Sequence, residues 1–323
     1  MIKKTLYFGN PAYLSLRNNQ LVIKMPAIEK AANVAELIRK ESIVTKPINE
    51  LGVVVLDHRQ ITLTQALLAA LLDNNVSVIT CDARSMPIGL QLPLYTNTTQ
   101  NERFRCQLEA SLPLRKQLWQ QTIQAKIENQ ASVLAHTTST EVGCMLAWAR
   151  SVRSGDPENL EARAAAYYWK NLFHKQHPQF VRRREGEPPN NLLNYGYAIL
   201  RAIIARALVG SGLLPTLGIH HHNRYNAYCL ADDIMEPYRP YVDLLVVNLI
   251  RSGVDYSTLT KDLKTQLLSI PTTDVCINGK RSPLMVAATT TAASLAKCFY
   301  GEIKKILYPS ITPTNQHETS KRI

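Results

Sequence analysis

The chain has 323 residues, a length that favours two domains at roughly 100 to 200 residues each. Hydrophobic residues make up 46% of it and charged residues 19%, which excludes an intrinsically disordered protein and a fibrous one. The net charge of +12 favours a polyanionic partner such as nucleic acid, although a mildly basic metabolic enzyme can carry the same balance.

The cysteine spacing and the apolar runs indicate where the protein works. The six cysteines form no CxxC pair, which excludes the common zinc and redox motifs and fits a reducing compartment. Asn10 and Pro11 interrupt the first apolar stretch and leave it too short for a signal peptide. Asp243 and Asn248 break the apolar run at 242–250, well below the roughly 20 residues of a spanning helix. We expect a cytoplasmic protein without a membrane segment.

Residues 1–95 are predicted to form a small β-domain. Leu and Ile alternate with polar residues on both sides of Asn18-Asn19, a pair that tolerates positive φ, so residues 12–25 are predicted to form a hairpin. Short β-branched runs predict two buried strands, and an Ala/Leu-rich run predicts a capped helix between them. These three elements are expected at residues 48–56, 76–81 and 64–72.

Residues 96–308 are predicted to form a larger all-α domain, which makes the fold class α+β. Apolar residues at spacings of three and four predict helical stretches over 104–135, 141–152, 160–173, 192–212, 226–250 and 282–307. The segment 174–191 contains prolines, a glycine and consecutive arginines, and is predicted to be a basic irregular loop. Residues 309–323 are predicted to be a polar C-terminal tail.

Three carboxylates are concentrated in the segment 217–243. Asp232 and Asp233 precede Glu236 by four and three residues, so on a helix all three are expected to approach one face. Buried together without a cation they would repel one another. A solvated face, a protonated carboxylate and a bound divalent metal each remove that repulsion.

A histidine triplet, His220, His221 and His222, precedes these acids by ten residues. Three consecutive side chains cannot all point the same way, so at most two of them can join a ligand set with Asp233 and Glu236. Mixed imidazole and carboxylate ligands favour Mg²⁺ or Mn²⁺ over structural zinc.

A second acidic candidate lies some sixty residues earlier. Asp156 can cap a helix whose first turn contains Glu161, and the helix dipole alone favours an acid there. Spacing does not distinguish Glu161 from Glu158 as a functional residue.

Basic residues are expected to surround this acidic centre. A metal site within a basic surface suits phosphodiester chemistry, since arginine and lysine hold the backbone while the metal polarises the phosphate. The candidate DNA-binding residues are Arg182, Arg183 and Arg184 in the loop, the Lys280-Arg281 pair, and Arg59 and Arg84 near the ends of N-terminal strands.

Four segments carry a resemblance to a known family. They are YFGNPAYLSLRNNQLVI at 7–23, GDPENLEARAAAYYWKNLF at 155–173, PPNNLLNYGYAILRA at 188–202, and LGIHHHNRYNAYCLADDIMEPYRPYVD at 217–243. Together they resemble the CRISPR-associated integrase of spacer acquisition, the larger of the two near-universal adaptation proteins, in its type II branch.

The resemblance implies a ligand set and a reaction. The family's metal ligands carry over to Glu161, His221 and Glu236, with Asp233 as an accessory acid beside the metal. The metal is expected to be Mg²⁺ or Mn²⁺. The reaction implied is attack by the 3′-hydroxyl of a captured DNA fragment on a phosphodiester at the edge of a CRISPR repeat, with nuclease activity when water replaces that hydroxyl.

The resemblance also implies partners. These are double-stranded DNA, a second copy of the chain, and the small adaptation protein, whose dimer is flanked by two integrase dimers in a heterohexamer. The type II effector nuclease and an accessory ring protein are further candidates. Two rival functions are a catalytically silent DNA-binding scaffold and a metal-dependent hydrolase of a small phosphate ester, for which the sequence has no Gly-rich phosphate cradle.

Overall fold

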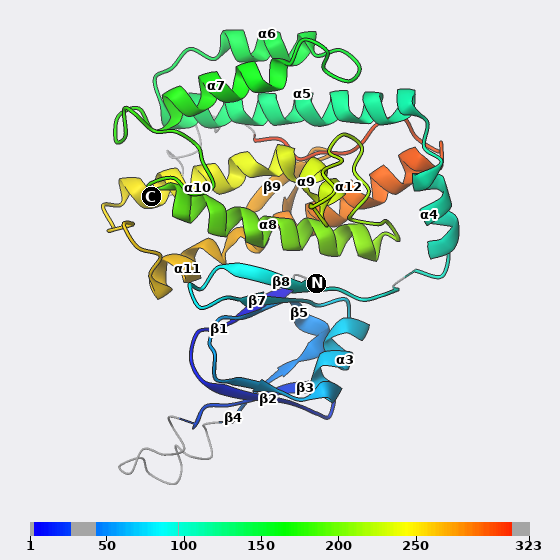
Figure 1. The fold of residues 1–323 in the computed structure, drawn as a ribbon, viewed down its shortest axis with the longest axis vertical. Helices are drawn as coiled ribbons and strands as arrows, with labels where there is room; N and C mark the ends of the chain where they lie inside the picture. The colour runs from blue at the N-terminus through cyan, green and yellow to red at the C-terminus, as the bar shows by residue number, and fades with distance from the viewer. Residues whose placement is uncertain (1–2, 27–42, 96, 312–323) are drawn as a thin grey trace, which may run out of the picture.

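The protein consists of a strand-rich N-terminal unit and a larger helical unit packed on it. A computed structural model describes residues 3–26, 43–95 and 97–311. Figure 1 shows the strands of the N-terminal unit gathered at one end of the molecule, with the helices of the larger unit stacked in layers above them.

The N-terminal unit contains two four-stranded sheets and a helix. The first sheet has the order β1-β5-β7-β8, formed by Lys4–Phe8, Leu51–Leu56, Ser77–Cys81 and Pro87–Gln91. The second has the order β4-β3-β2-β6, formed by Ile43–Pro47, Gln20–Lys24, Ala12–Arg17 and Ile61–Leu63. The predicted hairpin is confirmed as β2 and β3, with Asn18 and Asn19 at positive φ in the turn. The predicted helix is α3 (Gln65–Asp73), which Thr64 caps.

The strand β5 belongs to two hydrophobic cores at once. It pairs in parallel with β1 and β7, and a parallel strand covered on both faces has a continuous apolar run, here Val53-Val54-Val55. Val54 packs into the core between the two sheets, whereas Val53 and Val55 pack into the core of the helical unit. Since neighbouring side chains point to opposite faces, one strand joins the two units.

The helical unit has shorter helices than the sequence periodicity predicts. The stretch 104–135 divides into α4 (Gln100–Leu108) and α5 (Leu112–Thr137), because Ser111 caps a new helix at that point. The stretch 226–250 divides into α9 (Cys229–Met235), a 3₁₀ turn η2 (Glu236–Tyr238) and α10 (Arg239–Arg251). Pro237 and Pro240 lack the amide hydrogens that a single continuous helix requires. The other helices are α6 (Gly143–Ser151), α7 (Leu160–Leu172), α8 (Asn190–Gly210), α11 (Lys261–Leu267) and α12 (Leu284–Phe299).

The prediction of an all-α second domain is wrong, because this unit contains a β-hairpin. β9 (Asp274–Ile277) pairs antiparallel with β10 (Lys280–Pro283), and Asn278 and Gly279 form the turn at positive φ. Only a residue pair that tolerates positive φ closes such a tight turn. The first residues of the predicted tail also pack here, since Ser310 forms a bridge with Cys276. Residues 312–323 lie outside the described residues.

The central helix α8 is buried within the helical unit. By length and composition it could cross a membrane, because its most apolar stretch has a mean hydropathy of 1.4. However, 78% of that stretch is buried inside the protein. Its apolar surface therefore serves the core, in contact with α12, α10 and α9. The face of α8 toward the strands contacts β7 and β8, which orients the helical unit on the first sheet.

A buried ion pair also joins the two units. Lys264 of α11 donates to the Asp57 carboxylate at 2.8 Å, and the Tyr7 hydroxyl donates to the same oxygen at 2.6 Å. The Lys264 and Asp57 side chains are only 7% and 2% exposed. Each charge is therefore neutralised by its partner where water cannot do so.

Candidate metal site

Glu161 is positioned by the start of α7. The helix begins at Leu160, and the Asp156 carboxylate accepts hydrogen bonds at 2.9 Å from the amides of Leu160 and Glu161. Those amides are among the donors that every helix start leaves unpaired. Glu158 instead forms an exposed ion pair with Arg153. The structure thus separates two glutamates that spacing alone does not distinguish, and brings only Glu161 to the acidic centre.

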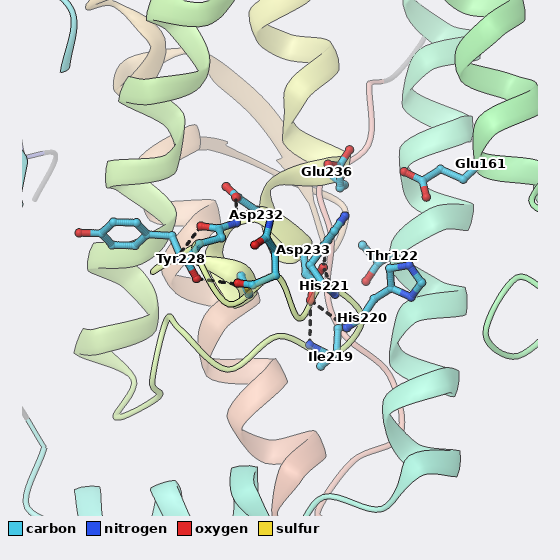
Figure 2. Close-up of polar contacts among 12 residues, drawn as sticks. Thr122, Glu161, Ile219, His220, His221, Tyr228, Asp232, Asp233 and Glu236 are labelled. Carbon is cyan, nitrogen blue, oxygen red and sulfur yellow. Dashed lines mark hydrogen bonds and ion pairs between the residues drawn. The ribbon is translucent and has the colours of Figure 1, made fainter. Parts of the chain in front are cut away.

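The carboxylates of Glu161 and Glu236 meet on a single ammonium group. Lys126 Nζ, from the middle of α5, lies 2.6 Å from Glu161 Oε1 and 2.6 Å from Glu236 Oε2. Figure 2 shows the two glutamates approaching each other from α7 and from the turn after α9. Sequence reasoning missed Lys126, although it follows Thr122 by four residues and Ile123 by three on the buried stripe of α5. Two distant segments are therefore joined by a cation already present in the chain.

Glu236 is a buried carboxylate held ionised by two cations. Arg239 Nη2 lies 3.1 Å from its Oε1, while Oε2 contacts Lys126 without hydrogen-bond geometry and has no hydrogen-bond partner. Burial opposes ionisation, but Arg239 and Lys126 outweigh it and lower the pKa of Glu236. Burial likewise disfavours the ammonium, yet Glu236 and Glu161 raise the pKa of Lys126. The shifted pKa values therefore favour the charged forms of both Glu236 and Lys126.

Asp233 shapes the histidine loop and orients His221. Its buried carboxylate accepts from the amides of Ile219 at 2.7 Å, His220 at 3.0 Å and His221 at 3.3 Å. A Cβ on Gly218 would lie 2.3 Å from the His221 carbonyl oxygen and 2.8 Å from Asp233 Oδ2, so only glycine fits there. His221 Nδ1 also contacts Asp233. Because an ionised carboxylate only accepts, Nδ1 carries the proton and Nε2 is the nitrogen left for another ligand.

Trp119 packs against two of the three imidazoles. The His220 ring stacks on Trp119 with centroids 4.1 Å apart, and the His221 ring meets Trp119 edge-on at 5.6 Å. The hydrogen bond to Asp233 raises the pKa of His221, whereas burial lowers it. The negative charges of Glu236 and Glu161 also raise this pKa. Burial, followed by the neighbouring His221, lowers the pKa of His220. His222 is exposed. Of the triplet, His221 has the hydrogen bond that fixes a ligand's tautomer.

The three acids of the segment 217–243 do not share one face, contrary to the sequence expectation. Asp232 pairs with Arg201 through two bonds of 2.6 and 3.1 Å and accepts from Asn226 at 2.7 Å. Successive residues of a helix point about 100° apart, so Asp232 faces α8 while Asp233 faces the histidine loop. Glu236 lies beyond the end of α9 and faces Lys126.

The arginines of the basic loop are not equivalent. Arg182 donates to the side-chain oxygens of Asn190 at 2.9 Å and Asn194 at 2.8 Å, which anchors the loop on α8. Arg183 and Arg184 are exposed. The other candidate DNA contacts, Arg59, Arg84, Lys280 and Arg281, are exposed as well. Arg59 and Arg84 lie in turns of the N-terminal unit, and the basic pair lies on β10.

A buried acid lies behind the site. Asp243 accepts hydrogen bonds from the hydroxyls of Tyr168 at 2.9 Å and Tyr197 at 2.5 Å. Burial raises the pKa of Asp243 to about 7, although these hydrogen bonds act in the opposite direction. The guanidinium groups of Arg182 and Arg239 lie over the Tyr197 ring, 5.2 and 4.8 Å from its centroid. Tyr197 therefore connects the loop anchor to the arginine that contacts Glu236.

A solvent-open cleft of about 310 Å³ lies beside His221. Its basic and imidazole side chains come from α5 and from the histidine loop, and they include Arg115, Arg224, His221 and His222. Nε of Arg115 is buried and has no hydrogen-bond partner among the residues that the structure describes. The cleft gives an anionic molecule access to the histidine side of the site.

The donor set fits a divalent cation. Two glutamate carboxylates converge, one of their oxygens lacks a hydrogen bond, and the neighbouring imidazole presents Nε2. Oxygen and imidazole ligands suit Mg²⁺ or Mn²⁺. Across residues 3–26, 43–95 and 97–311, no three His, Cys, Asp or Glu side chains stand as a preformed metal cluster. At this position a lysine lies between the acids.

Comparison with known proteins supplies the family. The model of the family described as CRISPR associated protein Cas1 matches residues 6–272. The chain is 32% identical over 320 residues to the CRISPR-associated endonuclease Cas1 of Neisseria meningitidis serogroup C (strain 8013), covering 98% of this chain and 99% of that protein. It is 30% identical over 253 residues to a CRISPR-associated endonuclease Cas1 of Saccharolobus solfataricus, covering 75% and 73%.

Solved structures share the fold over most of the chain. A casposase bound to integration product superposes with a TM-score of 0.75 at 20% identity, covering 99% of this chain and 96% of that one. A Cas1 protein from Thermotoga maritima gives a TM-score of 0.70 at 14% identity, covering 92% and 97%. A chain of a Cas6-RT-Cas1–Cas2 complex gives 0.72 at 19%, covering 96% of this chain and 36% of that one. With the family model matching from residue 6 to residue 272, this chain belongs to the CRISPR associated protein Cas1 family.

Proposed function

We propose that the chain is a metal-dependent DNA integrase and endonuclease that inserts short DNA fragments into a CRISPR array. The observation that carries the proposal is the meeting of Glu161 and Glu236, which lie 75 positions apart in the sequence, on one cation position beside His221. The endonuclease name of the Neisseria relative and the integration product in the casposase complex support the same reaction class.

Glu161, His221 and Glu236 would hold one Mg²⁺ or Mn²⁺. Asp233 would act chiefly through His221, because its oxygens already accept the loop amides and Nδ1. Such a carboxylate fixes the tautomer and ring orientation of a ligating histidine. Direct contact between Asp233 and the metal stays a prediction.

In the proposed reaction the nucleophile belongs to the DNA. The 3′-oxygen of the captured fragment attacks the target phosphorus, a new P–O bond forms, and the bond to the leaving 3′-oxygen breaks. The proton of the attacking hydroxyl passes to solvent and the leaving oxygen takes one up. The bound ion would supply Lewis acidity to the phosphate and the two oxygens. Because one phosphodiester replaces another, no ATP is consumed.

The DNA is proposed to reach the site across a basic surface. Arg115 and Arg224 line the cleft beside His221, and Arg183 and Arg184 are exposed on the loop that Arg182 anchors to the start of α8. Arg59, Arg84, Lys280 and Arg281 are further proposed contacts. Among the solved relatives is a Cas1–DNA complex with a TM-score of 0.51, whose name supports DNA as the partner.

The proposed assembly is that of the type II branch. Near full-length likeness to the Neisseria relative supports the branch, and the Cas1–Cas2 complexes among the solved relatives support a small adaptation partner. We propose a homodimer, a heterohexamer with that partner, and cytoplasmic activity alongside the effector nuclease and the ring protein.

The test is strand transfer of a labelled fragment into a repeat-containing plasmid with Mn²⁺. Glu161→Gln and Glu236→Gln are each expected to reduce transfer by about 100-fold or more, because each removes a metal ligand. Glu158→Gln is the matched control, since it changes an exposed glutamate three residues away on the same segment.

Each rival function has its own outcome. Transfer that is unchanged in both ligand variants would refute the metal site and leave the scaffold, in which the acids are structural. Hydrolysis of a small phosphate ester without salt-sensitive duplex binding would favour the hydrolase, because phosphate contacts weaken steeply with salt.

A further inference from the structure

We infer that the Lys126 ammonium occupies, in the metal-free protein, the position that the divalent ion takes on loading, so that metal binding at this site is an exchange of cations. This inference rests on the proposed metal site. It assigns to Lys126 the role of an internal competitor that sets how tightly the metal binds.

The contacts of Lys126 define that position. Nζ lies 2.6 Å from one oxygen of Glu161 and 2.6 Å from one oxygen of Glu236. A divalent ion bridging the same pair would bind these oxygens at about 2.0 to 2.2 Å. The two cations therefore require the same oxygen atoms, and neither can remain between the carboxylates while the other is there.

Burial makes the competition strong. The Lys126 side chain is 11% exposed and that of Glu236 is 5% exposed, so water screens their charges poorly. An ion of charge +2 placed beside a retained ammonium would be repelled at close range. Lysine has a flexible four-carbon stem, so the ammonium can leave without movement of α5.

The remaining contacts are consistent with an exchange. The Glu161 side chain is 24% exposed, which gives the site an open side. Arg239 contacts the other oxygen of Glu236 at 3.1 Å, and therefore keeps that carboxylate ionised after the ammonium leaves. The exchange breaks one hydrogen bond, which Lys126 Nζ donates to Glu161 Oε1 at 2.6 Å, and one ion pair, between Lys126 and Oε2 of Glu236.

The test compares Mn²⁺ affinity by isothermal titration calorimetry on the full chain without DNA. Lys126→Met is expected to bind Mn²⁺ at least about tenfold more tightly than the wild type, because the internal competitor is gone. The variant is expected to melt at lower temperature in EDTA and to gain more from Mn²⁺, since two unneutralised carboxylates then repel. Lys116→Met is the matched control on the exposed side of α5, with wild-type affinity expected.

A second measurement needs no variant. Acetylation of lysines in the wild-type protein, read by mass spectrometry, is expected to increase several-fold at Lys126 when Mn²⁺ replaces EDTA and to stay constant at Lys116. Equal or lower labelling of Lys126 with Mn²⁺ would overturn the inference, even where Lys126→Met does not fold.

The inference and the proposed function fail differently. Wild-type Mn²⁺ binding that depends on Glu161 and Glu236, but is not tightened in Lys126→Met, overturns the exchange alone. Absence of binding that depends on these glutamates, in both the wild type and Lys126→Met, overturns the metal site and the exchange together.

Discussion

The two buried lysines of the described residues, Lys264 and Lys126, contact carboxylates in different surroundings. Lys264 pairs with Asp57 between the two units, where the side chains are 7% and 2% exposed and a tyrosine hydroxyl completes the hydrogen bonding. Lys126 lies between Glu161 and Glu236, where one carboxylate is 24% exposed and another oxygen has no hydrogen bond. The first cluster is closed and satisfied, and the second is open on one side and incompletely satisfied.

The comparison shows what distinguishes a structural ion pair from a candidate site. Both clusters use the same ionised groups, so residue type alone does not separate them. The side chains of the closed pair are almost wholly buried, whereas the open cluster exposes Glu161 to solvent. Removing a partner should therefore cost stability in the first cluster and alter ligand binding in the second.

Breaking the closed pair should give the largest effect. Lys264→Met leaves Asp57 charged and buried, and is expected to lower the free energy of unfolding by about 3 to 5 kcal/mol. Urea denaturation followed by circular dichroism measures this loss. Lys261→Met, one turn earlier and exposed, should change stability by less than about 0.5 kcal/mol. An equal loss in both variants would show that the pair contributes nothing specific.

The acid behind the site extends the comparison, since Asp243 is buried and, within the described residues, its carboxylate accepts hydrogen bonds from two tyrosine hydroxyls and forms no ion pair. Its folded pKa of about 7 exceeds its ordinary value of 3.8, so its stabilising contribution is complete below pH 4 and is lost as pH rises through 7. Between pH 5 and 8 the free energy of unfolding of the wild type should therefore fall by about 2 to 3 kcal/mol more than that of Asp243→Asn, which has no carboxyl group to titrate at this position. Parallel stability curves for the variant and the wild type would contradict this pKa.

The open cluster should respond in ligand affinity. Asp233→Asn removes the acceptor that orients His221, and should weaken Mn²⁺ binding by about 10- to 100-fold. Calorimetry measures the affinity, and the ¹⁵N shifts of the His221 ring report the loss of a single tautomer. Asp232→Asn changes the adjacent acid, which pairs with Arg201, and is expected to leave Mn²⁺ affinity unchanged. The same affinity in both variants would remove the positioning role of Asp233.

The exposed arginines should give the smallest effect. Arg183→Ala with Arg184→Ala should weaken duplex binding uniformly across sequences and reduce the salt slope by about 2, one for each phosphate contact. Fluorescence anisotropy at several salt concentrations measures both quantities. Arg182→Ala should instead lower thermal stability, because Arg182 anchors the loop on Asn190 and Asn194. An unchanged slope in the double variant would mean that this loop does not touch DNA.

Local patterns predicted the elements of this fold where one physical signal dominated. Asn18-Asn19 between alternating residues identified the first hairpin, and the consecutive valines of β5 identified a buried strand, whose burial on both faces only the structure shows. Asn278-Gly279 carries an equally strong turn signal, yet the short strands beside it were overlooked within a mainly helical region. Helix ends were missed where proline or a capping serine interrupts a continuous apolar period.

The candidate site was predictable only in part. The four predicted residues Glu161, His221, Asp233 and Glu236 come together through direct contacts and shared neighbours. Lys126 was not found, because a buried lysine on one helix does not reveal which acids it meets. The sequence also did not show that Arg182 anchors the loop while Arg183 and Arg184 stay exposed. Three consecutive arginines are equivalent in the sequence, and only the fold brings the asparagines of α8 to one of them.

The double burial of β5 has a consequence for dissecting the molecule. Cutting the chain after residue 95 would uncover Val53, Val55 and Ile79, which lie against the helices in the intact protein. The N-terminal fragment would then expose an apolar sheet face to water and would tend to aggregate. The helical fragment would lose the strands against which α8 packs. We therefore expect the two units to unfold in a single cooperative transition.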